Sequence, residues 1–156
     1  MTTRNKQWPI LLLTVALAIA GCNRKTLYHR YAHTPLTGWE RADTLKFSMK
    51  PAVRSAVVQR DVEVRISEQY PFQSLNLVIE QTTLPSNVVR RDTLDCKLID
   101  PNGNILGDGI TLFQYRFHLP DTSLSEGDSV SISIHHNMKR EMLPGISDVG
   151  IRLTAY

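Results

Sequence analysis

The stretch DVEVRI, residues 61–66, alternates charged and apolar residues with a period of two. Successive side chains on a β-strand point to opposite faces, so this pattern predicts a strand with apolar residues in a core and charged residues in solvent. Residues 113–119, 130–134 and 149–153 show the same period. Each of these runs is therefore predicted to be a half-buried strand.

Shorter apolar runs at residues 45–49, 75–80, 88–90 and 94–99 are further strand candidates. Turn sequences rich in Pro, Gly, Asn and Asp separate the runs. No segment after residue 22 keeps a helical period over three turns. The sequence therefore predicts an all-β single domain, an antiparallel β-sandwich that is jelly-roll or immunoglobulin-like in general shape. The periodicity leaves the strand order open.

The N-terminal residues have the pattern of a lipoprotein signal peptide. Arg4 and Lys6 precede an apolar run over residues 10–20. As a helix this run spans roughly 16 Å, about half of a ~30 Å hydrocarbon core, so it is too short to be a spanning anchor. IAGC, residues 19–22, looks like a lipobox, which predicts cleavage before Cys22 and acylation of its thiol. A plain cleaved signal with an incidental cysteine is the alternative.

These features predict three regions: a signal peptide over residues 1–21, a lipidated N-terminus and tether over residues 22–38, and a β-sandwich domain over residues 39–156. The middle region has little apolar periodicity beyond scattered tyrosines, as is typical of a tether. Each buried methylene of an acyl chain contributes ~0.8 kcal/mol to the free energy of membrane binding. Two or three chains on Cys22 would therefore make attachment to a membrane effectively permanent.

Charge and cysteine content exclude several classes of function. The formal net charge is +3, and it falls to about +1 without the two signal-peptide cations. No run of Lys and Arg with interleaved aromatic residues is present, so we expect no nucleic-acid partner. Cys96 alternates with Leu94 and Leu98 in a strand-like pattern. We therefore predict that Cys96 is a small buried hydrophobe and not a nucleophile.

The strongest candidate for a metal site is DPNGNILGD, residues 100–108. Its oxygen-bearing side chains, at spacings reminiscent of a calcium loop, are those of Asp100, Asn102, Asn104 and Asp108. Ile105 occupies the position where such loops need glycine, and no glutamate closes the loop. Because a hairpin turn needs the same residue types, a turn is the favoured interpretation.

Histidines and glycine motifs give weaker signals. His135 and His136 are adjacent, so on a strand they point to opposite faces and cannot both bind one ion without a bulge. His29 and His33 have the spacing of half a zinc site without a second half. GISDVG, residues 145–150, is one residue too long for a nucleophile elbow. We therefore expect no metal, no cofactor, no small-molecule substrate and no catalytic residues.

Aromatic residues are more suggestive of binding. Those near the predicted tether and at one turn are Tyr28, Tyr31, Trp39, Tyr70 and Phe72. Such side chains can anchor a protein partner or stack on a sugar ring, although capping the ends of the sandwich is the favoured interpretation. An envelope carbohydrate-binding module is accordingly the alternative to a protein-interaction role, and a hydrolase with a hidden acid pair is a third.

Several blocks of the chain give it a resemblance to a known family. These are Cys22 with the tyrosines after it, Trp39 with residues 43–47, YPFQSLNL from residue 70, RDTLDCKL from residue 91, DPNG and LGDG from residues 100 and 106, and above all NMKREMLPGISDVGIRL over residues 137–153. In these blocks the chain resembles the gliding-motility lipoprotein GldH family. It departs from the family pattern at Asn104-Ile105, where an aromatic residue is expected, and at Val130, where a tyrosine is expected.

The resemblance implies a non-enzymatic outer-membrane lipoprotein that works with other envelope proteins of the gliding apparatus and the associated type IX secretion system. One functional residue is carried over from the family to this chain, namely the acylated Cys22. The residue after Cys22 is Asn23 and not the Asp that commonly retains lipoproteins in the inner membrane, and no Lys-plus-acid run resembling a surface-export signal follows. We therefore expect the periplasmic leaflet of the outer membrane.

Overall fold

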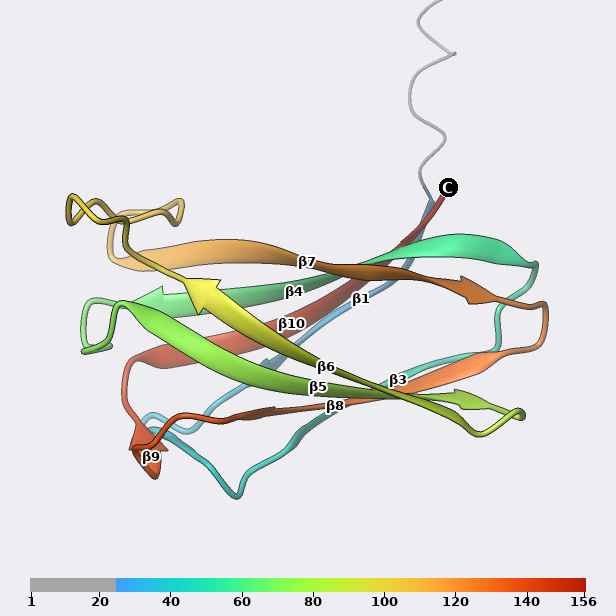
Figure 1. Ribbon diagram of the computed structural model, residues 1–156, viewed down its shortest axis with the longest axis horizontal. Coiled ribbons are helices and arrows are strands. Elements are labelled where there is room, and N and C mark those ends of the chain that lie inside the picture. The colour runs from blue at the N-terminus through green and yellow to red at the C-terminus, as the bar shows by residue number, and fades with distance from the viewer. Residues whose placement is uncertain (1–24) are drawn as a thin grey trace, which may run out of the picture.

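The computed structural model describes residues 25–156, and this part of the chain consists of strands and connecting loops (Figure 1). The strands are β1 (Lys25–His33), β2 (Trp39–Glu40), β3 (Leu45–Met49), β4 (Ala56–Ser67), β5 (Ser74–Leu84), β6 (Val88–Lys97), β7 (Leu112–Leu124), β8 (Ser129–His136), β9 (Met142–Leu143) and β10 (Ile146–Ala155). The prediction of an all-β fold is confirmed.

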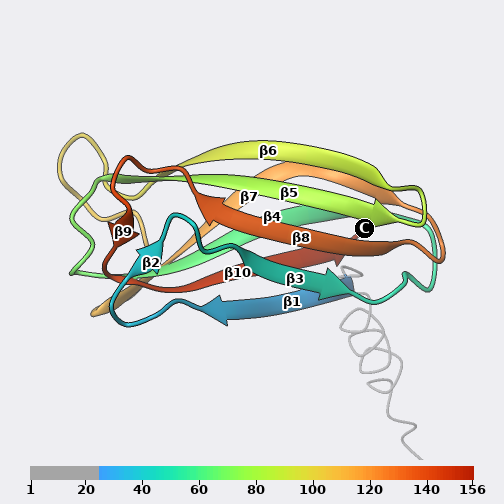
Figure 2. The same cartoon turned by 90° about the horizontal axis from the view of Figure 1, so that it is seen from below.

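Two four-stranded antiparallel sheets pack face to face (Figures 1 and 2). One sheet has the order β1-β10-β4-β7, the other has the order β3-β8-β5-β6, and β2 pairs with β9 at one end. The predicted sandwich is therefore confirmed. β1 and β3 are the edge strands on one side of the sandwich, and β7 and β6 are the edge strands on the other.

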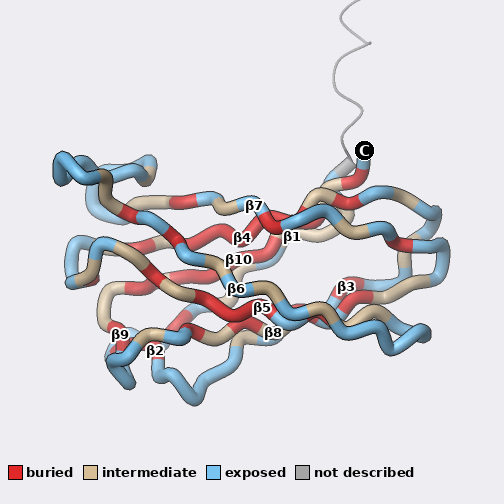
Figure 3. The backbone as a smooth tube through the Cα atoms, in the orientation of Figure 1, coloured by how far each residue is buried: buried red, intermediate tan, exposed pale blue. Residues whose placement is uncertain are grey.

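The core lies between the sheets and follows the predicted alternation. Val62 and Val64 are fully buried in it, and Figure 3 shows buried segments along the central strands. Cys96 is also fully buried, as predicted, and burial raises the pKa of its thiol. The solvent exposure predicted for the charged residues of this stretch is wrong, because Asp61 and Glu63 are both buried. Side chains from neighbouring strands cover the outer face of the sheet at this point.

An arginine connects the two sheets through the interior. Arg60 on β4 is 1% exposed and points inward in register with the core valines. Its guanidinium donates to the carbonyl of Pro120 on β7 at 2.8 Å, to Gln81 on β5 at 3.1 Å and to Asp92 on β6 at 2.9 Å. A buried charge needs partners of this kind, and here they come from both sheets.

The predicted tether is wrong for most of its length. Residues 25–33 form β1, which pairs with β10 along its length, from Lys25 opposite Ala155 to His33 opposite Asp148. A β-bulge at Thr26–Tyr28 interrupts the alternation of side chains, and this irregularity hid the strand from periodicity. The folded domain therefore includes the chain from Lys25 onward rather than from Trp39.

The DPNG segment is a turn, in agreement with the favoured interpretation. The carboxylate of Asp100 accepts hydrogen bonds at 2.8 Å from the backbone amides of Asn102 and Asn104, and from the side-chain amide of Asn104. Gly103 has a φ of +86°, which favours glycine. The turn uses the oxygens of Asp100 for its own geometry.

Candidate functional site

The two ends of the sandwich differ in a way that bears on function. Lys25, where β1 begins, pairs with Ala155 near the C-terminus, so both chain ends of the described part lie at one end of the sandwich (Figure 1). We call this the proximal end. The connections of residues 34–38, 68–73, 98–111 and 137–145 lie at the opposite end, which we call the distal end. Cys22 lies outside the described residues, three positions before Lys25.

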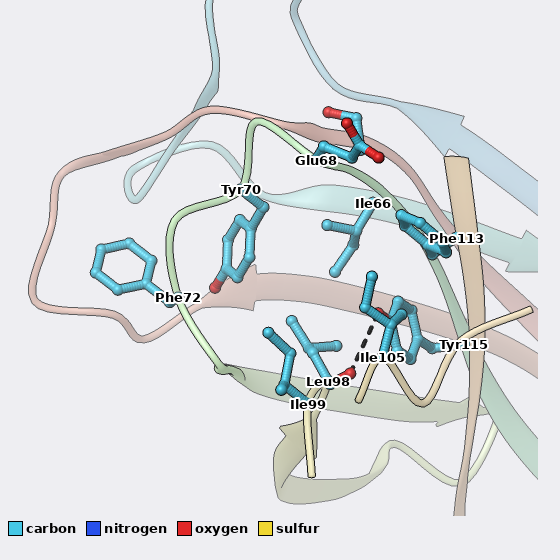
Figure 4. A pocket seen from close by; sticks show the side chains of 10 residues that line it. Ile66, Glu68, Tyr70, Phe72, Leu98, Ile99, Ile105, Phe113 and Tyr115 are labelled. Carbon is cyan, nitrogen blue, oxygen red and sulfur yellow. Dashed lines mark hydrogen bonds between the residues drawn. The ribbon is translucent and has the colours of Figure 1, made fainter. Parts of the chain in front are cut away.

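A pocket of about 290 Å³ opens at the distal end between the two sheets (Figure 4). Its lining is mainly apolar and comes from β4, β7 and the connections next to them; it includes Ile66, Tyr70, Leu98, Ile105 and Phe113. Glu68 is the acidic residue of the lining. The pocket is therefore suited to an apolar group of a partner rather than to a charged ligand.

The two phenols in this pocket are already bonded to the protein backbone. The hydroxyl of Tyr70 donates to the carbonyl of Ser74 at 2.9 Å, and the hydroxyl of Tyr115 donates to the carbonyl of Leu98 at 3.3 Å. Burial raises the pKa of Tyr115. Gly107 lies against the Tyr115 ring, where a Cβ atom would stand 2.6 Å from it, which explains the glycine in LGDG. The pocket lining offers no paired acid and base for proton transfer.

Exposed apolar side chains occur at both ends of the sandwich, and those at the distal end lie around the pocket. These distal apolar residues are Leu36, Ile105, Leu106, Ile110 and Leu112. Leu36 and Leu112 line a second hollow of about 450 Å³, and Ile110 is 87% exposed. Single exposed leucines are common on protein surfaces, whereas several on two neighbouring loops beside an apolar pocket are typical of a protein-interaction site.

A network of charged side chains covers the outer face of the sheet that contains β4. Its centre is Glu63, whose side chain is 0% exposed. His29 on β1 lies 2.9 Å from this carboxylate, Arg116 on β7 lies 2.8 Å from it, and Arg152 on β10 lies 3.2 Å from it. The hydroxyl of Tyr31 also donates to it. One carboxylate therefore joins all four strands of the sheet.

The pKa of Glu63 reflects these partners. Burial alone would raise it, but the hydrogen bonds from Tyr31 and His29 and the charges of Arg152 and Arg116 outweigh burial, so the pKa lies below its usual value. The carboxylate is therefore ionised at neutral pH. With partners on every side, Glu63 can join strands, but no approach is left for a reacting group.

The histidine pairs weighed as weak metal-site candidates separate in the structure. His29 faces Glu63, whereas His33 faces Asp148, so the two do not form half of one metal site. His136 is fully buried with its Nε2 atom 3.2 Å from the carbonyl of Trp39, and burial lowers its pKa, while His135 points to the other face. Among residues 25–156 no three His, Cys, Asp or Glu side chains gather where they could hold a metal ion.

The aromatic residues proposed for sugar stacking lie mostly inside the protein. Trp39 is 0% exposed, and its indole donates to the carbonyl of Asp43 at 3.0 Å. Tyr70 is 9% exposed. Tyr31 lies on the outer face of the sheet, but Arg65 covers its ring with Cζ 4.1 Å from the centroid. These side chains stabilise the fold and present no platform for a sugar.

Fold and site together define a small antiparallel β-sandwich with an apolar pocket at its distal end. Within residues 25–156 there is no apolar helix of the length needed to cross a membrane. The sequence model of the GldH lipoprotein family matches residues 26–153, and the chain belongs to this family. The resemblance found in the sequence is confirmed.

Two relatives match over nearly the full chain. The gliding motility lipoprotein GldH of Flavobacterium johnsoniae is 23% identical, covering 92% of this chain and 93% of the relative. A GldH homolog of Christiangramia forsetii is 24% identical, covering 92% of each chain. The family establishes a lipoprotein of gliding motility.

Two solved structures match at low similarity. Dimeric latent PorU from Porphyromonas gingivalis matches with a TM-score of 0.37 and 6% identity over 85% of this chain and 13% of that one. The VP2 subviral particle of infectious bursal disease virus matches with a TM-score of 0.38 and 14% identity over 85% and 32%. At these values neither match bears on function.

Proposed function

We propose that this protein is an outer-membrane lipoprotein that acts as a non-enzymatic structural and interaction component of the gliding motility apparatus associated with type IX secretion. Acyl chains on Cys22 hold it in the periplasmic leaflet, and its partners are other envelope proteins of motility or secretion. The proposal depends above all on one observation: β1 starts at the proximal end, whereas the apolar pocket and the distal apolar residues lie at the other end.

This arrangement orients the domain relative to the membrane. Because Cys22 precedes Lys25 by three positions, at most roughly 10 Å of chain separates the acylated residue from the first strand. The sandwich therefore stands directly on the membrane with its distal end outward. β1 is nine residues long, so the distal pocket stands about 30 Å from the anchored end.

The absence of catalysis is supported by how the polar groups are used. Glu63, the most buried carboxylate of the sheet, has four partners. The hydroxyls of Tyr70 and Tyr115 donate to backbone carbonyls. Groups occupied in this way stabilise a binding surface and do not supply a nucleophile or a base.

Site-specific photocrosslinking in the source cell tests the proposal. A photoreactive residue replaces Ile110 at the distal end, and Val88, which is 60% exposed at the proximal end of β6, is the matched control. We expect the probe at position 110 to crosslink to envelope proteins of motility or secretion and the probe at position 88 to give far less product. Equal crosslinking from both positions, or none from position 110, would contradict the proposed docking end.

A further inference from the structure

A groove of about 500 Å³, separate from the distal pocket and the hollow beside it, lies at the proximal end between edge strands β1 and β3. Figure 2 shows these two strands side by side along the open edge of the sandwich, with the start of β1 and the end of β3 near the C-terminus. Leu27 and Tyr28 line the groove from β1, and Met49 and Val53 line it from β3 and the loop that follows. Its walls are therefore apolar in part, with polar side chains such as Thr26 and Ser48 between the apolar ones.

Two cations stand beside these apolar walls. Arg30 on β1 and Lys50 after β3 both line the groove and are exposed, and the lining contains no acidic residue. Within the described part of the chain neither side chain forms a salt bridge, whereas Arg60, Arg116 and Arg152 each face a carboxylate. Unpaired cations beside an apolar groove match a ligand with an anionic head and an apolar tail.

The place of the groove indicates where such a ligand would come from. The groove begins at Thr26, four positions after Cys22, so acylation of that cysteine would bring the groove to the membrane surface. Val53 is 77% exposed on the same loop as Lys50, in a position to reach the level of the headgroups. A Lys or Arg near an anionic lipid surface contributes about 1 kcal/mol of attraction.

We propose that the β1–β3 groove binds a phospholipid of the anchoring membrane, with the lipid phosphate between Arg30 and Lys50 and the start of an acyl chain against Tyr28 and Met49. This inference depends on the proposed anchoring through Cys22. The groove fixes the sandwich in one orientation and so keeps the distal end facing away from the membrane.

Depth-dependent fluorescence quenching tests the groove in the native lipoprotein reconstituted in phospholipid nanodiscs. The Val53→Cys chain takes one dye, because Cys96 is fully buried and Cys22 would be acylated, and Leu36→Cys places the same dye at the distal end. We expect a quencher on the lipid headgroups to quench the dye at position 53 and not the dye at position 36. Similar quenching at both positions would overturn the proposed orientation.

Charge reversal separates phosphate binding from simple nearness to the membrane. Arg30→Glu with Lys50→Glu is expected to lower quenching at position 53 by at least about twofold. Lys46→Glu with Arg91→Glu changes the net charge equally at exposed sites outside the groove and should leave quenching unchanged. Discs of neutral glycolipid without phosphate should weaken quenching as the groove variant does.

The outcomes also separate the groove from the anchor. Co-elution of the protein with the discs reports anchoring, and the effect of the groove variant on quenching reports lipid binding. If the protein co-elutes with the discs, but quenching at position 53 is the same with and without the Arg30→Glu and Lys50→Glu substitutions, or the same in phospholipid and phosphate-free discs, the groove proposal alone is overturned. The protein's own acyl chains would then occupy the groove, or the loop would merely lie near the membrane. A chain that fails to co-elute overturns the anchor and, with it, the groove.

Discussion

The ring of Tyr31 lies across Gly150 of the neighbouring strand, so close that a Cβ atom at position 150 would stand 2.7 Å from the ring. Because the ring crosses β10, the Tyr31 hydroxyl on β1 reaches Glu63 on β4, on the outer face of the sheet. The glycine of the SDVG block therefore has a structural reason, which is passage of a side chain over the backbone.

Replacing this glycine should destabilise the fold. Gly150→Ala puts a methyl group into the Tyr31 ring and, more weakly, against the carbonyl of Arg30 at 3.1 Å, so we expect a loss of about 1–3 kcal/mol in the free energy of unfolding. Urea unfolding measures it. In a Tyr31→Ala background the same substitution should cost less, and an equal cost in both backgrounds would mean that the ring is not the obstacle.

Glu63 should make stability depend on pH in the acid range. Its pKa is lowered in the folded state from the ordinary value of 4.5, so the unfolded chain binds the proton more readily. This contribution to stability is fully present above about pH 5 and is lost as the pH falls through the folded pKa. The free energies of unfolding of wild type and Glu63→Gln should therefore differ by roughly 2 kcal/mol at pH 7, and this difference should shrink as the pH falls through the folded pKa of Glu63.

Convergence of the two free energies of unfolding at acid pH is the informative outcome for Glu63. Loss of a neutral contact would instead give the same difference between wild type and Glu63→Gln at every pH. Glu80→Gln is a matched control, since Glu80 is exposed on β5 and forms no salt bridge within residues 25–156. It should leave the free energy of unfolding within about 0.5 kcal/mol of wild type at every pH.

The alternation of residues 61–66 predicted the inner face of β4 correctly and its outer face wrongly. Periodicity reports the face to which a side chain points, and Glu63 does point away from the core. Its burial comes from His29, Arg116 and Arg152 on three other strands. Which strands become neighbours depends on the order β1-β10-β4-β7, which a local pattern does not contain.

The distal pocket and β1 were missed for related reasons. Leu98 and Phe113 line one pocket from opposite ends of a long connection, and Ile66 joins them from β4, so only the folded chain brings them together. The outer face of β1 carries polar side chains, and one of them, His29, contacts the buried carboxylate of Glu63. In the sequence these polar residues resembled a tether. By contrast, the burial of Cys96 and the DPNG turn depend on local pattern alone, and both were predicted correctly.

Breaking the interior arginine should cost more than changing the surface. Arg60→Ala removes a buried side chain, takes the donor away from the buried amide oxygen of Gln81 and leaves the carboxylate of Asp92 with Arg90 at 3.5 Å, so we expect a loss of about 3 kcal/mol or more in the free energy of unfolding. Arg91→Ala, at an exposed position of β6 next to Asp92, is the control. A loss below about 1 kcal/mol for Arg60→Ala would show that the bridge between the sheets contributes little.

The proposed attachment of the protein depends on Cys22, which lies outside the described residues. Cys22→Ala removes the sulfur that would bear the lipid, and because Cys22 precedes β1 by three positions, the substitution should leave the folded domain intact. We expect the variant to leave the membrane pellet while its thermal unfolding midpoint stays within about 2 °C of wild type. Cys96→Ala is the matched control, since it alters a fully buried cysteine and should lower the midpoint without changing the fraction in membranes. If the Cys22→Ala chain stayed with the pellet, or if mass spectrometry found no lipid on the native N-terminus, another part of the protein would have to hold it there.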